Sequence, residues 1–150
     1  MNKLLLIAVA VFGSFLLSCN NNQNQDDPIP LVAVDKYINV TFPGYINLQI
    51  PGGWVVEPGG VKGLFIMKNF TSEYLCFDLN CSYHPLDACS KLTVDSSGLF
   101  FKCGKYDSSV WKPCCGSEFS YDGIPAKAPA TRVLRKYNCT FDGTLLHIFN

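Results

Sequence analysis

Residues 38–42, Ile-Asn-Val-Thr-Phe, and residues 46–50, Ile-Asn-Leu-Gln-Ile, alternate apolar with polar side chains. Such alternation puts every second side chain on one face of an extended chain, which predicts two half-buried β-strands. Similar short stretches follow at residues 54–56, 63–67, 74–78, 92–95, 99–101, 132–140 and 145–149. Turns rich in glycine and proline separate them, and no convincing amphipathic helix interrupts them. The sequence therefore predicts an all-β fold, an antiparallel sandwich or partial barrel.

Composition and charge limit the classes of function. The chain has 150 residues, which fit one domain, and its 12 basic and 12 acidic side chains cancel. A nucleic-acid-binding protein needs a surplus of cations, so we expect no nucleic-acid partner. The one basic cluster is Arg132, Arg135 and Lys136. Strand alternation would put Arg132 and Lys136 on one face and Arg135 on the other, as a solvated strand surface.

The N-terminus has the pattern of a secretory leader. Lys3 precedes an apolar run of 14 residues, 4–17, which suits a signal peptide and is short for a membrane-spanning helix. Leu16-Leu17-Ser18-Cys19 resembles the bacterial lipobox, whose cysteine takes a diacylglycerol and becomes the mature N-terminus. The alternative is an ordinary secretory signal with a chance cysteine.

These features predict three segments. Residues 1–18 are the expected lipoprotein signal peptide, residues 19–30 the lipidated cysteine and a polar tether, and residues 31–150 the β domain. The membrane partner is then reached through lipidated Cys19. Asn20 stands where an inner-membrane retention signal has aspartate, so we expect an outer-membrane lipoprotein of the cell envelope. It would lie on the periplasmic face or, as Asp26-Asp27 weakly favours, on the cell surface.

Seven cysteines remain after Cys19, and this number is odd. An oxidising envelope allows at most three disulfides among them and leaves one thiol over. Cys76 and Cys139 have aromatic neighbours in strand-like stretches, so we expect small core residues that could also pair with each other. The other five cysteines lie between residues 81 and 115.

The region of those five cysteines resembles a known family. Residues 113–119, Pro-Cys-Cys-Gly-Ser-Glu-Phe, resemble the second cluster-binding loop of Rieske iron–sulfur domains, and residues 74–78 followed by Cys81 resemble the strand that enters the first loop. The similarity extends from about Gly60 to Asn150, and the whole chain is similar to Rieske-like lipoproteins of Gram-negative envelopes. The resemblance implies a Rieske-like all-β fold with two cysteine-bearing loops. Rieske loops read Cys-x-His and Cys-x-x-His, hold a 2Fe–2S cluster, and carry two further cysteines that bridge them.

The ligand positions depart from the family's pattern. His84 follows Cys81 by three residues and Tyr83 occupies the expected place. In the second loop Lys112 stands at the cysteine position and Cys115 at the histidine position. The cluster motifs are therefore degenerate.

One repair treats residues 104–112 as an insertion, which makes Cys103 the displaced ligand. Because successive residues of an extended chain point to opposite sides, Cys114 and Cys115 would serve different purposes. The resemblance then implies a disulfide between Cys89 and Cys114. It leaves a ligand set of Cys81, His84, Cys103 and Cys115.

This ligand set leaves three interpretations open. It could hold a 2Fe–2S cluster in an electron-transfer protein, with non-standard Cys3His ligation, or a structural zinc ion. The third is that disulfides join the loops, for example Cys81 with Cys103 or Cys115, and that no cofactor is bound. We favour the third, which predicts a structural or interaction module and no enzyme beyond, at most, an electron-transfer component. The sequence identifies no protein partner or electron donor.

Other catalytic sites have less support. A nucleophile pair of Cys115 and His84 lacks an identifiable aspartate or asparagine partner. His147 alternates with apolar neighbours and is expected on a strand surface or in the core. The Gly-Gly pairs lack the Lys-Ser/Thr of a phosphate-binding loop, so they predict turns.

Overall fold

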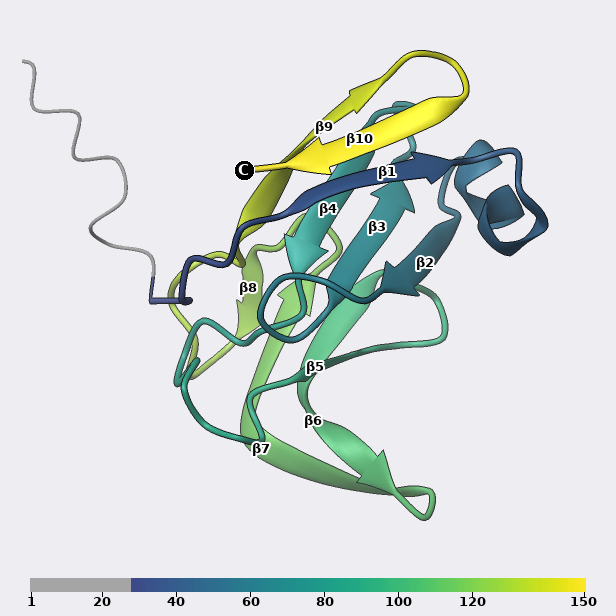
Figure 1. Cartoon of the computed structure of the whole chain (residues 1–150). Coiled ribbons are helices and arrows are strands. Elements are labelled where there is room, and N and C mark those ends of the chain that lie inside the picture. The colour runs from purple at the N-terminus through teal and green to yellow at the C-terminus, as the bar shows by residue number, and fades with distance from the viewer. Residues whose placement is uncertain (1–27) are drawn as a thin grey trace, which may run out of the picture.

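The computed structural model describes residues 28–150, and the predicted signal peptide and most of the tether lie outside these residues. Ten strands and one short 3-10 helix make up the described chain (Figure 1). No helix within residues 28–150 has the length and apolar character needed to cross a membrane.

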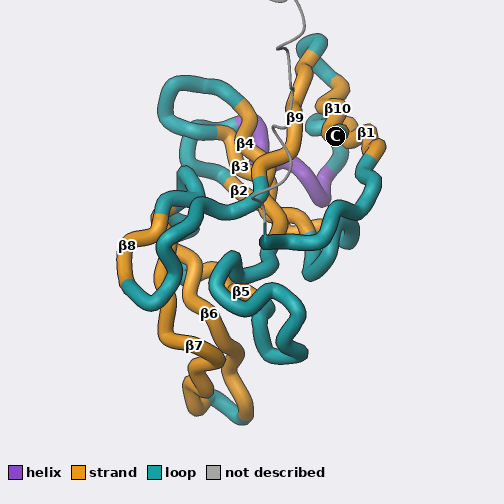
Figure 2. Tube along the Cα trace, turned by 90° about the vertical axis from the view of Figure 1, so that its left-hand side faces the viewer, coloured by secondary structure: helices purple, strands orange, loops and turns teal. Residues whose placement is uncertain are grey.

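The strands form two antiparallel sheets. The larger contains, in spatial order, β1 (Asp35–Asn39), β10 (Leu145–Phe149), β9 (Lys136–Phe141), β4 (Tyr74–Asp78), β3 (Leu64–Lys68) and β2 (Trp54–Glu57). The smaller contains β5 (Leu92–Val94), β6 (Phe100–Asp107), β7 (Val110–Ser120) and β8 (Pro125–Lys127). The predicted all-β antiparallel class is confirmed, and Figure 2 shows the β6–β7 hairpin extending away from the larger sheet.

The core lies on both faces of β3. Phe65 and Met67 belong to a cluster shared with the smaller sheet, whereas Leu64 and Ile66 belong to a second cluster beneath β1 and β10. Phe65 meets Phe101 of β6 edge to face, with ring centroids 4.7 Å apart. Because these four apolar side chains of β3 are all buried, the strand lies between the two clusters.

The predicted strand at residues 46–50 is wrong. Residues 43–49 instead form the 3-10 helix η2 (Pro43–Gln49), which begins at a proline whose fixed φ suits a first helical position. Leu48 is its only buried residue, while Ile46 and Ile50 are exposed. The alternating pattern therefore gave a wrong prediction at residues 46–50, because only Leu48 of the three apolar side chains contributes to the core.

Several predicted strand limits also change. The stretch predicted at residues 99–101 continues to Asp107, and β7 and β8 were not among the predicted strands. The strand predicted at residues 132–140 begins only at Lys136. The basic cluster is therefore not an alternating strand surface, because Arg132 and Arg135 precede the strand. All three basic residues line one open cavity of about 1090 Å³.

The packed part of the chain includes a residue assigned above to the tether. Ile29 is 1% exposed, and the Arg135 guanidinium donates a hydrogen bond to its carbonyl. The structure therefore extends the folded part at least to Ile29, two residues before the predicted start at residue 31.

Candidate thiol site

Two segments of the chain carry the candidate site. The connection between β4 and β5, residues 79–91, carries Cys81 and Cys89, and the β6–β7 hairpin carries Cys103, Cys114 and Cys115. The second group therefore lies on strands, which corrects the prediction of a second cysteine-bearing loop. The predicted insertion at residues 104–112 corresponds to the outer part of this hairpin.

Hydrogen bonds close the β4–β5 connection at its base. The Cys81 amide donates to the Ser90 carbonyl at 2.8 Å, and the buried Ser90 hydroxyl donates to the Asn80 side-chain oxygen at 2.6 Å. The Asn80 side-chain amide donates in turn to the Pro85 carbonyl. These bonds fix the backbone on both sides of Cys81.

A β-bulge in the hairpin directs the other cysteines. Lys102 pairs with Glu118 and Gly104 with Pro113, so one residue of β6 faces four residues of β7. Cys103 is that single residue, and Cys114 and Cys115 belong to the four. Gly116 takes a φ of +78°, a conformation that glycine adopts without a steric penalty. Bulges re-aim side chains, and this one turns Cys115 toward the β4–β5 connection.

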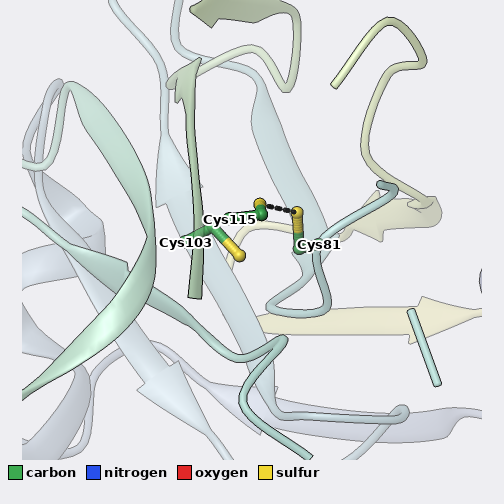
Figure 3. Close-up of side chains that lie close together, drawn as sticks. All are labelled: Cys81, Cys103 and Cys115. Atoms are coloured by element: carbon green, nitrogen blue, oxygen red, sulfur yellow. Dashed lines mark hydrogen bonds between the residues drawn. The ribbon is translucent and has the colours of Figure 1, made fainter. Parts of the chain in front are cut away.

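Three thiols meet at this point. The sulfur atoms of Cys81, Cys103 and Cys115 all lie within 4.8 Å of one another, and those of Cys81 and Cys115 are 3.6 Å apart (Figure 3). Cys81 and Cys103 are each 1% exposed, while Cys115 is half-buried. We call these three residues the thiol triad.

Ser117 holds one member of the triad. The Cys115 thiol is 3.2 Å from the Ser117 hydroxyl, which also accepts the Ala130 amide at 2.9 Å. Ser117 is fully buried. Ser117 was not among the site residues predicted from the sequence, although its position two residues after a cysteine was a usable signal.

Hydrogen bonding separates the acidities of two triad members. A hydrogen bond from the Cys103 thiol lowers the pKa of Cys81 to about 6, against the effect of burial, which alone would raise it. The same hydrogen bond and burial raise the pKa of Cys103. Cys81 is therefore the thiolate of this pair and Cys103 its donor.

Cys89 and Cys114 form a disulfide, with Cα atoms 5.5 Å apart and a sequence separation of 25 residues. This pairing was the one implied by the resemblance. It joins the β4–β5 connection to β7. The consecutive residues Cys114 and Cys115 thus serve different purposes, as alternation predicts. The Asp87 carboxylate lies near both sulfurs, but the disulfide removes both thiols as ligands.

His84 does not join the triad. Its side chain is 62% exposed, stacks on the Tyr83 ring at 4.1 Å between centroids, and lies 3.5 Å from the Asp87 carboxylate. Of the four residues proposed as ligands from the sequence, the structure brings three together. Lys112, which stands at the cysteine position of the second Rieske loop motif, pairs with Asp107 near the end of the hairpin.

The other residues considered from the sequence, Cys76, Cys139 and His147, have surroundings that indicate a structural role. Cys76 is fully buried, and its thiol hydrogen bonds with that of Cys139, which raises the pKa of Cys76 and lowers that of Cys139. Both thiols are free, and both residues pack in or against the core, as expected. His147 lies on a strand surface, 2.7 Å from the Asp35 carboxylate and stacked on Tyr37.

The 2Fe–2S cluster implied by the resemblance needs four ligands, two for each iron. Among residues 28–150, the triad supplies three thiols within mutual reach and no histidine, aspartate or glutamate joins them. Cys89 and Cys114 are bonded to each other. The residues brought together at this site therefore do not fit the cluster.

Comparisons with known proteins identify the fold. No family model and no curated protein matches the sequence. The structure is similar to the cyanobacterial plasma membrane Rieske protein PetC3 from Synechocystis PCC 6803, with 18% identity, a TM-score of 0.51, and coverage of 79% of this chain and 98% of that one. It is also similar to the ferredoxin of carbazole 1,9a-dioxygenase from Nocardioides aromaticivorans IC177, with 15% identity, a TM-score of 0.44, and coverage of 75% and 96% respectively. The similarity to the PetC3 structure shows that the chain has a Rieske-like fold.

Proposed function

We propose that this chain is a lipid-anchored envelope protein whose Rieske-like domain holds no iron–sulfur cluster and acts as a structural or interaction module. The observation that carries the proposal is the composition of the thiol triad. Three sulfurs converge, and the imidazole nearest in sequence, that of His84, is turned to solvent. In this proposal, the cluster-binding site is degenerate because it lacks a full set of four ligands.

The anchor rests on the sequence alone. Cys19 lies outside the described residues, and its role as the lipidated residue is an expectation from the lipobox. The folded part of the described chain includes Ile29, which lies ten positions after Cys19 and is already buried. A short connection of this kind would hold the domain close to an outer-membrane surface.

Exposed apolar side chains support the interaction role. Tyr106 and Val110 are exposed near the end of the β6–β7 hairpin, and Leu86 is 83% exposed in the β4–β5 connection. Apolar side chains that lie together on the surface mark protein contact sites, and the Tyr106 ring lies against that of Trp111 with centroids 5.1 Å apart. The hairpin and the connection therefore offer a partner two projecting segments, joined by the Cys89–Cys114 disulfide.

An electron carrier is the second candidate, because the fold is Rieske-like and three of four ligands already converge. For a cluster to bind, residues 82–87 would have to rearrange so that His84 leaves Asp87 and enters the site. The two candidates differ in whether this rearrangement occurs when iron is supplied.

Reconstitution separates the two candidates. The full chain, kept free of oxygen, is given ferrous iron and sulfide, and its visible absorption is recorded after removal of unbound ions. We expect no cluster spectrum, either in the wild type or in Cys139→Ser, which changes a thiol outside the triad. A stoichiometric cluster that is lost in His84→Ala would replace this proposal with the electron carrier.

A further inference from the structure

We propose that Cys81, Cys103 and Cys115 form a three-coordinate thiolate site for a soft monovalent cation, Cu(I). This inference goes beyond the proposed function and rests on its premise that the domain holds no iron–sulfur cluster, because the same thiols cannot hold both. It concerns the thiols that are left over once the Rieske cofactor is found not to fit.

The spacing of the sulfurs suits a single central ion. Metal–thiolate bonds of about 2.3 Å place three sulfurs around one ion about 4.0 Å apart. In the structure one sulfur pair is separated by 3.6 Å and no pair by more than 4.8 Å. The observed separations therefore bracket the value that one central ion requires.

The number and type of donors select the ion. Structural zinc sites take four protein ligands and a 2Fe–2S cluster also takes four. Within the described part of the chain, the triad offers three sulfurs with no imidazole or carboxylate in reach. Thiolates are soft ligands that favour Cu(I), a closed-shell ion that is stable with three sulfur donors.

The frame around the triad is fixed before any ion binds. Cys81 is held by its amide bond to Ser90, Cys103 lies at the bulge, and Cys115 adjoins the disulfide-bonded Cys114. These three anchoring points belong to three different segments, so the ligands need little reorganisation. Cys81 and Cys103 are shielded from water, and the half-buried Cys115 leaves a route for the ion.

Ser117 completes the site as a positioning residue. Its oxygen already accepts the Ala130 amide at 2.9 Å, so its hydroxyl proton is available to the Cys115 sulfur 3.2 Å away. When Cys115 is a thiolate, that hydroxyl donates to it and orients it toward the other sulfurs.

The test uses the full chain isolated without oxygen and without added reductant, so that the Cys89–Cys114 disulfide is retained. Cu(I) is supplied as its bicinchoninate complex, and transfer to the protein is followed by loss of the complex's colour. We expect one Cu(I) per chain, and X-ray absorption should show three sulfur neighbours.

Variants assign the ligands. Loss of a ligand should cost more than loss of an outer-shell partner, so Cys103→Ser and Cys115→Ser should each weaken binding by at least about 100-fold. Ser117→Ala should weaken it by about 10-fold while keeping one ion per chain. Cys139→Ser, a matched change in the other free thiol pair, should leave the affinity unchanged. The circular dichroism spectrum of each variant shows whether it is folded.

Three results would overturn the inference. The first is unchanged Cu(I) affinity in folded Cys103→Ser and Cys115→Ser. The second is a Cys81–Cys115 disulfide in the anaerobic protein, formed by loss of two protons and two electrons to an oxidant. The third is tight binding of Zn²⁺ that His84→Ala abolishes and Cu(I) does not displace. None of these results would restore a 2Fe–2S cluster, so the proposed function is tested separately.

Discussion

At the scale of single residues, one buried carboxylate and the thiol triad are the features whose chemistry depends most on their surroundings. Asp78 is fully buried and accepts hydrogen bonds from the Tyr137 hydroxyl at 2.9 Å and from the Val61 and Lys62 amides at 2.7 and 3.2 Å. Burial and the neighbouring carboxylate raise the pKa of Tyr137. A side chain at Gly60 would collide with both, since its Cβ would lie 2.3 Å from the Asp78 carboxylate.

The substitution Tyr137→Phe measures this contact. It removes one donor from a buried carboxylate, and hydrogen bonds to charged groups contribute about 2 kcal/mol, so the free energy of unfolding should fall by about that amount. Urea titration followed by tryptophan fluorescence gives the value. Tyr37→Phe, at an exposed strand position, is the control and should change it little. Equal losses in the two variants would show that the buried contact is not a special contributor.

The hydrogen bond between Cys103 and Cys81 sets a pH dependence. Because the pKa of Cys81 is lowered to about 6, its thiolate absorption in the ultraviolet should appear as the pH rises through about 6. Cys103→Ala removes the donor and leaves burial, so the pKa should rise and the absorption should appear at higher pH. Cys103→Ser keeps a donor and should stay closer to the wild type. Cys81→Ser supplies the blank, and an identical titration in Cys103→Ala would contradict the assignment.

At the scale of elements, the β6–β7 hairpin and its connection to residues 79–91 define the site. Residues 104–107 pair with residues 110–113, and Ser108 and Ser109 form the two-residue turn with positive φ angles. Below this outer part the bulge presents Cys103 and Cys115 to Cys81. The hairpin thus combines a projecting arm with one side of the thiol triad.

The Cys89–Cys114 disulfide should stabilise the pair of segments. It joins residues separated by 25 positions, and the restriction of the unfolded chain corresponds to about 3 kcal/mol. The double variant Cys89→Ser/Cys114→Ser should therefore unfold at a lower temperature in calorimetry. Cys76→Ala/Cys139→Ala, which changes two free thiols, is the matched control for lost cysteines. A peptide map of the oxidised protein that shows both Cys89 and Cys114 free would contradict the pairing.

The sequence predicted the elements where one face is buried and the other is not. Alternation gave β10 with its predicted bounds, because Leu146 and Ile148 are buried between more exposed neighbours. The strand predicted at residues 38–42 is shifted, because β1 covers Asp35–Asn39 and shares only residues 38 and 39 with it. It failed at residues 46–50, where Pro43 begins a 3-10 helix. It also missed the outer hairpin, since the side chains there are mostly exposed and no core face imposes a pattern.

The candidate site was predictable in its membership and less so in its geometry. Cysteine spacing and the resemblance gave the disulfide and three convergent thiols. They did not give the direction of His84, because its stacking on Tyr83 and its contact with Asp87 depend on the path of the loop. The bulge that orients Cys115 likewise has no signal beyond Gly116.

At the scale of the whole molecule, a β domain with a Rieske-like fold follows an N-terminal segment with the pattern of a lipoprotein leader. The two sheets share one core cluster, which includes Phe65, Phe101 and Phe119. Cys81 and Cys103 of the thiol triad belong to this cluster, and Cys115 packs against it. The site is therefore supported by the core on one side and by the disulfide on the other. We propose that the lipid anchor holds the protein at the membrane and that the exposed end of the smaller sheet contacts a partner.

The anchor is tested by Cys19→Ala. Without the lipobox cysteine, no thiol is available for the diacylglycerol group, so labelling with a radioactive fatty acid should disappear and the protein should leave the membrane fraction. Ser18→Ala retains a small residue before the cysteine and should behave as the wild type. An unchanged mass and normal membrane partition of Cys19→Ala would exclude lipidation at this residue.

Iron content tests the central claim most directly. The full chain is produced in an iron-replete host and isolated without oxygen, and its iron is measured together with its visible spectrum. Because the triad supplies only three of the four ligands of a 2Fe–2S cluster, we expect a colourless protein with well under one iron per chain. About two irons per chain with a cluster spectrum, both lost in Cys103→Ser and in His84→Ala, would contradict the account.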